Sequence, residues 1–191
     1  GFFTHLPGIR IMYPSNATDA KGLLKYACRS NDPVLFLEHK GLYRQPFSSG
    51  PEYDNSYTIN PGVARIVQEG SDITIITWGA IVQKSVEASN KSNYSVEIID
   101  LRTLNPVDYN LIKGSIQKTN KVIIAHEDNI TGGFGAELAS TITEKYFELL
   151  DGPIKRVGSL DVPIAYASTL EDSILVQTEW IEKSINELGD Y

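Results

Sequence analysis

Apolar runs of strand length alternate along this chain with segments of helical periodicity. In the longer part of the chain the runs cover residues 73–78, 96–101, 121–125 and 154–157. Parallel strands need crossover connections long enough for a helix, and the helices then cover both faces of the sheet. The alternation therefore predicts an α/β fold in which a mostly parallel sheet is the middle of three layers.

The first 45 residues form a smaller unit of the same kind. Residues 9–13 and 34–37 are strand-like, and Ser15 and Asn16 are N-cap candidates for a helix between them. The apolar stripe of that helix consists of Ala20, Leu23, Leu24, Ala27 and Cys28. This single β-α-β piece is too small to hold a core alone. Residues 46–62 are rich in Pro, Gly, Ser, Asn and Tyr, so we expect a linker there and a complete domain over 63–191.

Local signals predict where two later helices begin. Asn105 followed by Pro106 is typical of an N-cap and a first-turn proline. Ser168 and Glu171 have the spacing of a capping box, which predicts one final helix. Its inward residues are expected to be Ile174, Ile181, Ile185 and Leu188.

Composition excludes several classes of protein. A hydrophobic content of 41% and a charged content of 21% are those of a soluble globular chain, and no apolar run approaches membrane-spanning length. The net charge of −7 argues against nucleic acid or an anionic membrane as a partner. The single cysteine, Cys28, excludes an internal disulfide and indicates a reducing compartment. Its place in the apolar stripe predicts a buried, inert thiol.

The excess negative charge lies in the last third of the chain. Residues 121–191 hold 13 Asp and Glu against 5 Lys and Arg, whereas residues 1–120 hold 11 against 12. One interpretation is a solvated surface that keeps the protein soluble. The other is a docking surface for a basic partner, because complementary charge accelerates and selects association.

A polar, glycine-rich stretch, residues 126–137, follows the apolar run 121–125. Open α/β sheets place ligands and contacts at the carboxyl ends of their strands. A phosphate site is disfavoured, because no Lys follows the glycines and Glu127 and Asp128 would repel an anion. His126 could be a tuned acid or base. We favour a structural histidine, satisfied by a carboxylate or carbonyl and fixing the turn at a subunit interface.

The motifs also carry a family resemblance. The run HEDNITGGFGAE at 126–137 resembles a segment in the β subunit of 2-oxo acid dehydrogenases, the thiamine-diphosphate E1 components of the pyruvate and branched-chain complexes. The blocks that continue the resemblance, in the family's order and over nearly the whole chain, are HLPGI at 5–9, PSNATDAKGL at 14–23, DPV at 32–34, LYR at 42–44, IDLRTLNP at 99–106, PIKRV at 153–157 and DVP at 161–163.

The resemblance implies a transketolase C-terminal fold, preceded by the last β-α-β piece of a thiamine pyrimidine-binding domain. The implied enzyme decarboxylates a 2-oxo acid with thiamine diphosphate and Mg²⁺ and reductively acylates the lipoyl group of the acyltransferase E2. The family's catalytic residues fall upstream of Gly1, so we assign no catalytic or cofactor-binding residue. We expect a fragment that serves subunit assembly and E2 docking and is inactive alone, in the cytoplasm or, in a eukaryote, the mitochondrial matrix.

The same resemblance implies partners and sites. A structural K⁺ would lie at the turn bearing Ala27, Ser30 and Asp32, although the family often has Asp and Asn at the last two positions. The partners would be the E1 α subunit or α half, a second β subunit, and the peripheral-subunit-binding domain of E2. The residues expected at these contacts are Tyr43, Arg44, His126, Glu127, Asp128 and Tyr191.

Two other interpretations stay open. Transketolase and deoxyxylulose-phosphate synthase share the architecture but lack the HEDN-x-TGGFGAE and LYR motifs. A stand-alone, non-enzymatic interaction module is the second alternative. The absence of an initiator Met and the incomplete first domain favour a fragment of the E1 enzyme instead.

Overall fold

The strands divide between two sheets in the computed structural model, which describes residues 1–191 throughout. The larger sheet has the order β3-β5-β4-β7-β8 and the smaller one β2-β1-β6. The strands are β1 (Arg10–Met12), β2 (Val34–Phe36), β3 (Arg65–Gln68), β4 (Ile73–Thr77), β5 (Val96–Asp100), β6 (Thr103–Asn105), β7 (Val122–Asn129) and β8 (Lys155–Ser159).

The larger sheet is mostly parallel, as predicted. β5, β4, β7 and β8 run parallel, and β3 pairs antiparallel with β5 at the edge. Every residue of β4 and β5 is buried, and apolar residues predominate in both strands. β3 was not predicted, because its half-buried residues carry no clear alternation.

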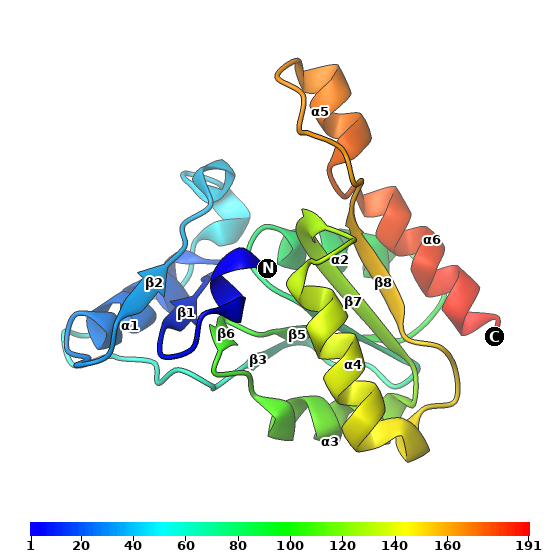
Figure 1. Cartoon of the computed structure of the whole chain (residues 1–191), viewed down its shortest axis with the longest axis horizontal. Coiled ribbons are helices and arrows are strands. Elements are labelled where there is room, and N and C mark those ends of the chain that lie inside the picture. The colour runs from blue at the N-terminus through cyan, green and yellow to red at the C-terminus, as the bar shows by residue number, and fades with distance from the viewer.

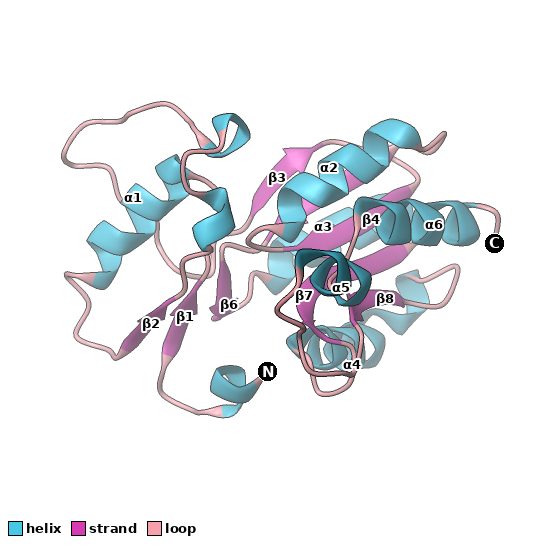
Figure 2. Ribbon diagram, turned by 90° about the horizontal axis from the view of Figure 1, so that it is seen from above, coloured by secondary structure: helices cyan, strands magenta, loops and turns pink.

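Helices cover both faces of this sheet and complete three layers (Figures 1 and 2). α2 and α6 pack on one face with Ile75 and Ile98, whereas α3 and α4 pack on the other with Ile76 and Ile99. The predicted α/β class is therefore confirmed. The α-helices are α1 (Ala17–Ala27), α2 (Ile81–Lys91), α3 (Tyr109–Thr119), α4 (Phe134–Tyr146), α5 (Ser168–Ile174) and α6 (Thr178–Gly189), and the short 3₁₀ helices are Phe2–His5, Lys40–Leu42, Pro46–Ser48 and Phe147–Leu149.

The small sheet combines two strands from the first 45 residues with one strand from beyond residue 62. β1 and β2 are parallel with α1 between them, as the β-α-β pattern predicts. β6, which the sequence analysis did not predict, pairs antiparallel with β1. Residues beyond the expected linker thus complete the sheet that the first 45 residues begin.

The segment over 46–62 packs along α1. The Ile59 amide donates to the Gly22 carbonyl at 3.1 Å, Thr18 Oγ1 donates to the Pro51 carbonyl at 2.8 Å and Lys25 Nζ to the Asn55 carbonyl at 2.6 Å. The segment approaches α1 most closely at Gly22, where a Cβ would lie 2.6 Å from Ile59 Cγ1. Residues 46–62 are therefore an ordered connection, although their composition is rich in polar residues, Pro and Gly.

Two predicted helix starts are wrong. Asn105 ends β6 and donates from Nδ2 to the Ile9 carbonyl at 2.7 Å, so it caps no helix. The N-cap of α3 is Asp108, whose Oδ1 accepts from the Leu111 amide at 3.0 Å. Ser168 lies inside α5 and caps nothing, because the N-cap position belongs to Ala167.

The expected single last helix is two helices. The chain is extended at Leu175, where the fully buried Val176 enters the core between α5 and α6. Ile174, Ile181, Ile185 and Leu188 are nevertheless all buried, as predicted. Ile174 ends α5, and the other three line the buried face of α6.

Cys28 is exposed, so the prediction of a buried thiol is wrong. α1 buries Asp19, Gly22 and Leu23, and five residues after Leu23 the helix has turned about 140° away from that face. Asn16 is the N-cap, as predicted, and its side chain accepts from the Asp19 amide at 2.9 Å.

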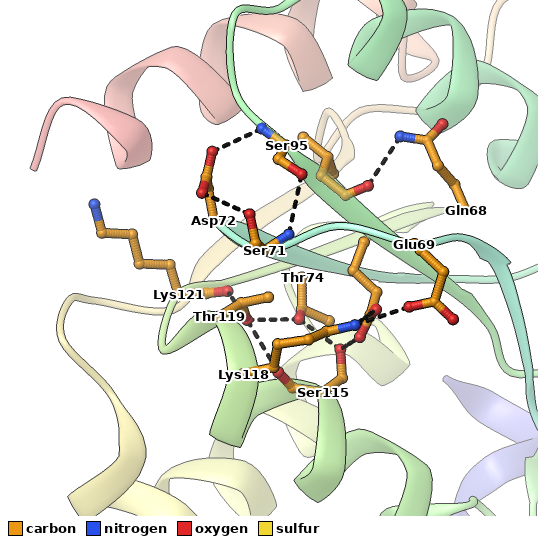
Figure 3. A network of polar contacts seen from close by, with 12 residues as sticks. Gln68, Glu69, Ser71, Asp72, Thr74, Ser95, Ser115, Lys118, Thr119 and Lys121 are labelled. Carbon is orange, nitrogen blue, oxygen red and sulfur yellow. Dashed lines mark hydrogen bonds and ion pairs between the residues drawn. The ribbon is translucent and has the colours of Figure 1, made fainter.

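A buried polar network fastens α3 to the larger sheet (Figure 3). Glu97 of β5 is fully buried and accepts from Ser115 and Lys118. Thr74 of β4 bonds Ser115 and Thr119 at 2.7 Å each. No helix is both long and apolar enough to cross a membrane.

Candidate functional site

The carboxyl ends of β1, β2 and β7 meet where the two sheets adjoin. β7 continues through Asn129, so His126 to Asn129 belong to the strand rather than to the predicted turn. Burial decreases toward the end of this strand. His126 is fully buried, whereas the Asp128 side chain is 42% exposed.

Glu127 gathers the residues at this edge. Its Oε1 lies 3.0 Å from His39 Nε2, and its Oε2 accepts from the Tyr13 hydroxyl at 3.4 Å. Tyr13 directly follows β1, and His39 follows β2. We call Tyr13, His39 and Glu127 the edge cluster. Neither Tyr13 nor His39 was predicted, although both follow strand-like runs whose carboxyl ends should meet there.

The pKa shifts of His39 and Glu127 favour charge pairing between them. The hydrogen bond with Glu127 raises the pKa of His39 despite partial burial. Burial alone would raise the pKa of Glu127, but the hydrogen bond and charge of His39, with smaller effects of Lys84 and Tyr13, hold it below its ordinary value. Burial and then the Glu127 charge raise the pKa of Tyr13 far above its ordinary range. The edge cluster therefore connects the two sheets through Glu127. None of its three side chains is set up as a nucleophile.

His126 stacks on Trp78 with ring centroids 5.5 Å apart and an interplanar angle of 11°. Neither ring nitrogen has a hydrogen-bond partner, so the expected carboxylate or carbonyl partner is wrong. Burial lowers the pKa of His126, which keeps the ring neutral. A Cβ at Gly135 would lie 2.4 Å from its Nε2, and one at Gly133 would lie 2.7 Å from its Cε1. The glycines of the motif thus make room for this ring.

Tyr43 and Arg44 lie beside a cavity of about 350 Å³ that His39 and the N-terminus of α1 also line. The Tyr43 ring is half exposed, and its hydroxyl donates to Glu38 at 3.0 Å. Arg44 has a φ of 62°, which turns the chain sharply between two 3₁₀ helices. Both residues stand at the same edge as Glu127.

Tyr191 lies far from this edge, at the other end of α6. It is 74% exposed, and its ring lies close to Gly152. The neighbouring Asp190 accepts from the Tyr94 hydroxyl at 2.5 Å, and Lys121 Nζ donates to the Gly189 carbonyl at 3.1 Å. These bonds hold the chain terminus against the body of the domain.

The predicted cation site offers backbone oxygens only. The Ala27 carbonyl accepts from the Ser30 amide at 3.1 Å, and Ser30 Oγ from the Asp32 amide at 3.1 Å. The Asp32 carboxylate is paired with Arg10 at 2.6 Å, so its side chain does not fit a cation. No group of three or more His, Cys, Asp or Glu side chains that could hold a metal occurs. The K⁺ site stays a prediction.

Comparison with known families decides the relationship. Residues 62–181 match the model of the family described as "Transketolase, C-terminal domain". The chain belongs to the transketolase C-terminal domain family. Residues 1–46 match a second model, "Transketolase, pyrimidine binding domain". The split gene transketolase, described as an inactive beta4 tetramer, has the same fold, with a TM-score of 0.78 at 23% identity over 98% of this chain and 59% of that one.

Curated relatives confirm the resemblance to E1 β subunits. This family member is 44% identical over 165 residues to "2-oxoisovalerate dehydrogenase subunit beta 2, mitochondrial" of Arabidopsis thaliana, covering 85% of the chain and 46% of that protein. It is 39% identical over 182 residues to "Pyruvate dehydrogenase E1 component subunit beta, mitochondrial" of Dictyostelium discoideum, covering 93% and 51%. The Staphylococcus aureus pyruvate dehydrogenase E1 component subunit beta is 43% identical over 164 residues, covering 84% and 50%. The chain spans about half the length of these relatives.

Proposed function

We propose that this chain is the C-terminal portion of an E1 β subunit of a 2-oxo acid dehydrogenase complex. The observation that carries the proposal is the identity of 39–44% to three E1 β subunits over most of this chain. The complete enzyme would decarboxylate a 2-oxo acid oxidatively and transfer the acyl group to the lipoyl arm of E2. In this reading residues 1–45 end a pyrimidine-binding domain, 46–62 connect, and 63–191 form the C-terminal domain.

The chain's own work would be assembly and docking. At the carboxyl edge His39 is paired with Glu127, and His126 is a buried ring without a hydrogen-bond partner. Thiamine diphosphate and Mg²⁺ would serve the complete enzyme, with no residue of this chain assigned to either. A structural K⁺ would rest on the carbonyls of the turn at Ala27 and Ser30.

Assembly would use the carboxyl edge of the sheets. Tyr43 and Arg44 are exposed there, and Asp128 and part of Glu127 reach the surface beside them. His126 would contribute from beneath by fixing the end of β7 against Trp78. The α subunit and a second β subunit are the partners that we assign to this edge. The location would be the bacterial cytoplasm or the mitochondrial matrix.

Docking of E2 would use the acidic surface of residues 121–191 around Tyr191. Part of this charge is neutralised within the chain, since Lys155 pairs with Glu187 at 3.3 Å and Lys91 with Glu179 at 3.2 Å. Glu182 and Asp151 have no such partner and stay available, as does the exposed Tyr191. A small basic domain would meet complementary charge here.

An activity assay tests the division of labour. The chain alone, supplied with a 2-oxo acid, thiamine diphosphate, Mg²⁺ and an artificial electron acceptor, should show no turnover above the reaction without protein. A complete E1 from the same organism is the positive control. Turnover by the chain alone would contradict the assignment to assembly and docking.

A further inference from the structure

One segment of the molecule exposes apolar side chains that nothing covers. We call residues 160–174, between β8 and α6, the arm. Val162 is 45% exposed, Ile164 is 61% exposed and Tyr166 is fully exposed, and Leu160 and Leu170 are about half exposed. Single exposed apolar residues are ordinary, but a run of them in one segment marks an interaction surface or an aggregation hazard.

The arm stands away from the rest of the molecule. Figure 1 shows α5 beyond the ends of β8 and α6, and Figure 2 shows it in front of the sheet when the molecule is seen from above. Within α5 only Ile174, its last residue, is buried. A helix of seven residues is marginal in water without tertiary packing. The arm therefore lacks, within this chain, the packing that would normally stabilise such a helix.

The base of the arm is nevertheless firmly held. Asp161 accepts from the amide and the hydroxyl of Thr131 at 3.0 and 2.7 Å, and these bonds lower the pKa of its carboxyl group. Asn129 Nδ2 donates to the Leu160 carbonyl at 2.7 Å, and the Leu160 amide donates to the Ile174 carbonyl at 3.1 Å. A fixed base presents the arm in one orientation, which lowers the entropy cost of binding.

The charge of the arm specifies its partner. No Lys or Arg occurs between Arg156 and Lys183, whereas Asp161, Glu171 and Asp172 lie on the arm. Two copies of the arm packed around a twofold axis would bring like charges together, which disfavours self-association through it. The fitting surface is an apolar groove on a different protein, bordered by Lys and Arg.

We propose that the arm inserts into such a groove on the E1 α subunit, an inference that rests on the proposed function. The base of the arm is tied to the carboxyl edge, where Ser159 Oγ donates to the Glu127 carbonyl at 2.7 Å. The surface proposed for E2 lies instead at the far end of α6, around Tyr191. Binding of the arm would hold the α subunit over the edge cluster and leave the E2 surface free.

A titration with the purified E1 α subunit of the same organism tests the arm. The double variant Ile164→Asp/Tyr166→Asp places two charges in the proposed contact and should raise the Kd roughly 30-fold or more, the loss typical of interface hot spots. Phe147→Asp is the matched control, because Phe147 is 68% exposed at the end of α4, away from the arm. It should bind as the wild type does. Circular dichroism should show equal melting temperatures for all three proteins.

The E2 binding domain separates the two proposals. The arm variant should bind that domain as tightly as the wild type. If the arm variant binds the α subunit with wild-type affinity, or if the wild type binds E2 but no α subunit, the arm inference is overturned while the proposed function stands. If the wild type binds neither protein, both are contradicted.

Discussion

His126 shows how one residue can explain a whole motif. The ring is buried against Trp78, has no polar partner and stays neutral because burial lowers its pKa. The glycines at 133 and 135 are small because this ring occupies the space that a Cβ would need. From the sequence, the histidine and the glycines could be placed at a strand end, but not their contact, because alternation along a strand does not say which side chain stacks across it.

Acid should destabilise the protein through His126. The unfolded histidine takes up a proton near pH 6.5, whereas the folded one resists it, so the free energy of unfolding should fall as the pH drops below about 6.5. The slope is at most about 1.4 kcal/mol per pH unit for one proton. Urea unfolding from pH 7.5 to 5.5 measures it, and His126→Leu should be less pH-dependent than the wild type. Equal pH dependence in the two proteins would show that this histidine titrates normally.

A glycine pair tests the packing around the same ring. Gly135→Ala places a Cβ 2.4 Å from His126 Nε2, and the stacked ring has no room to retreat. Its free energy of unfolding should fall by about 1–3 kcal/mol, the usual range for overpacking. Gly114→Ala is the control, because it lies on an exposed face of α3 with nothing within 4 Å and should be stabilising by about 0.5–1 kcal/mol. If Gly135→Ala does not lower the free energy of unfolding relative to Gly114→Ala, the packing argument is refuted.

At the scale of elements, the position of α3 depends on one buried carboxylate. Glu97→Gln removes the charge that Ser115 and Lys118 contact in the interior. Thermal and urea unfolding should show a loss of about 1–3 kcal/mol, less than for a fully buried pair because Lys118 can turn to water. Glu69→Gln, which removes the exposed partner of the same lysine, should leave stability unchanged within error. If both variants lose the same free energy of unfolding, the burial of Glu97 does not contribute to the stability of the protein.

Elements differ in how well the sequence predicts them. β4, β5 and the first part of β7 were predictable because buried strands are rich in apolar residues. β6 was not, because three residues between a sharp turn and a proline carry no period. The last helix was predicted as one because Ile174 and Ile181 keep helical spacing across the extended segment at Val176. Only tertiary packing distinguishes a continuous helix from two in line.

For the whole molecule, a buried ionic group links the two sheets. Asp19 of α1 pairs with Arg102 at 2.7 Å and with Arg65 at 3.5 Å, and Arg65 also reaches Asp100 of β5 at 3.5 Å. Asp19 makes the shortest ion pair of this group and contacts both arginines, so the link depends mainly on it. The sequence did not predict the link, because its members lie far apart along the chain.

Loss of Asp19 should weaken the whole molecule. Asp19→Ala leaves the partly buried guanidinium of Arg102 without its partner, so the free energy of unfolding should fall by about 3 kcal/mol. Urea unfolding measures this loss. Glu52→Ala is the control, because Glu52 is 92% exposed and 3.9 Å from Lys21, and its removal should have no measurable effect. Wild-type stability in Asp19→Ala would mean that the two sheets do not depend on each other.

Docking of a basic E2 domain is best measured by calorimetric titration of this chain with the peripheral-subunit-binding domain of E2 from the same organism. We expect binding at low salt that weakens steeply at high salt, because the contact is between opposite charges. Tyr191→Ala with Glu182→Gln should weaken the binding further. No binding at low salt, or binding that salt does not change, would show that this acidic surface does not dock E2.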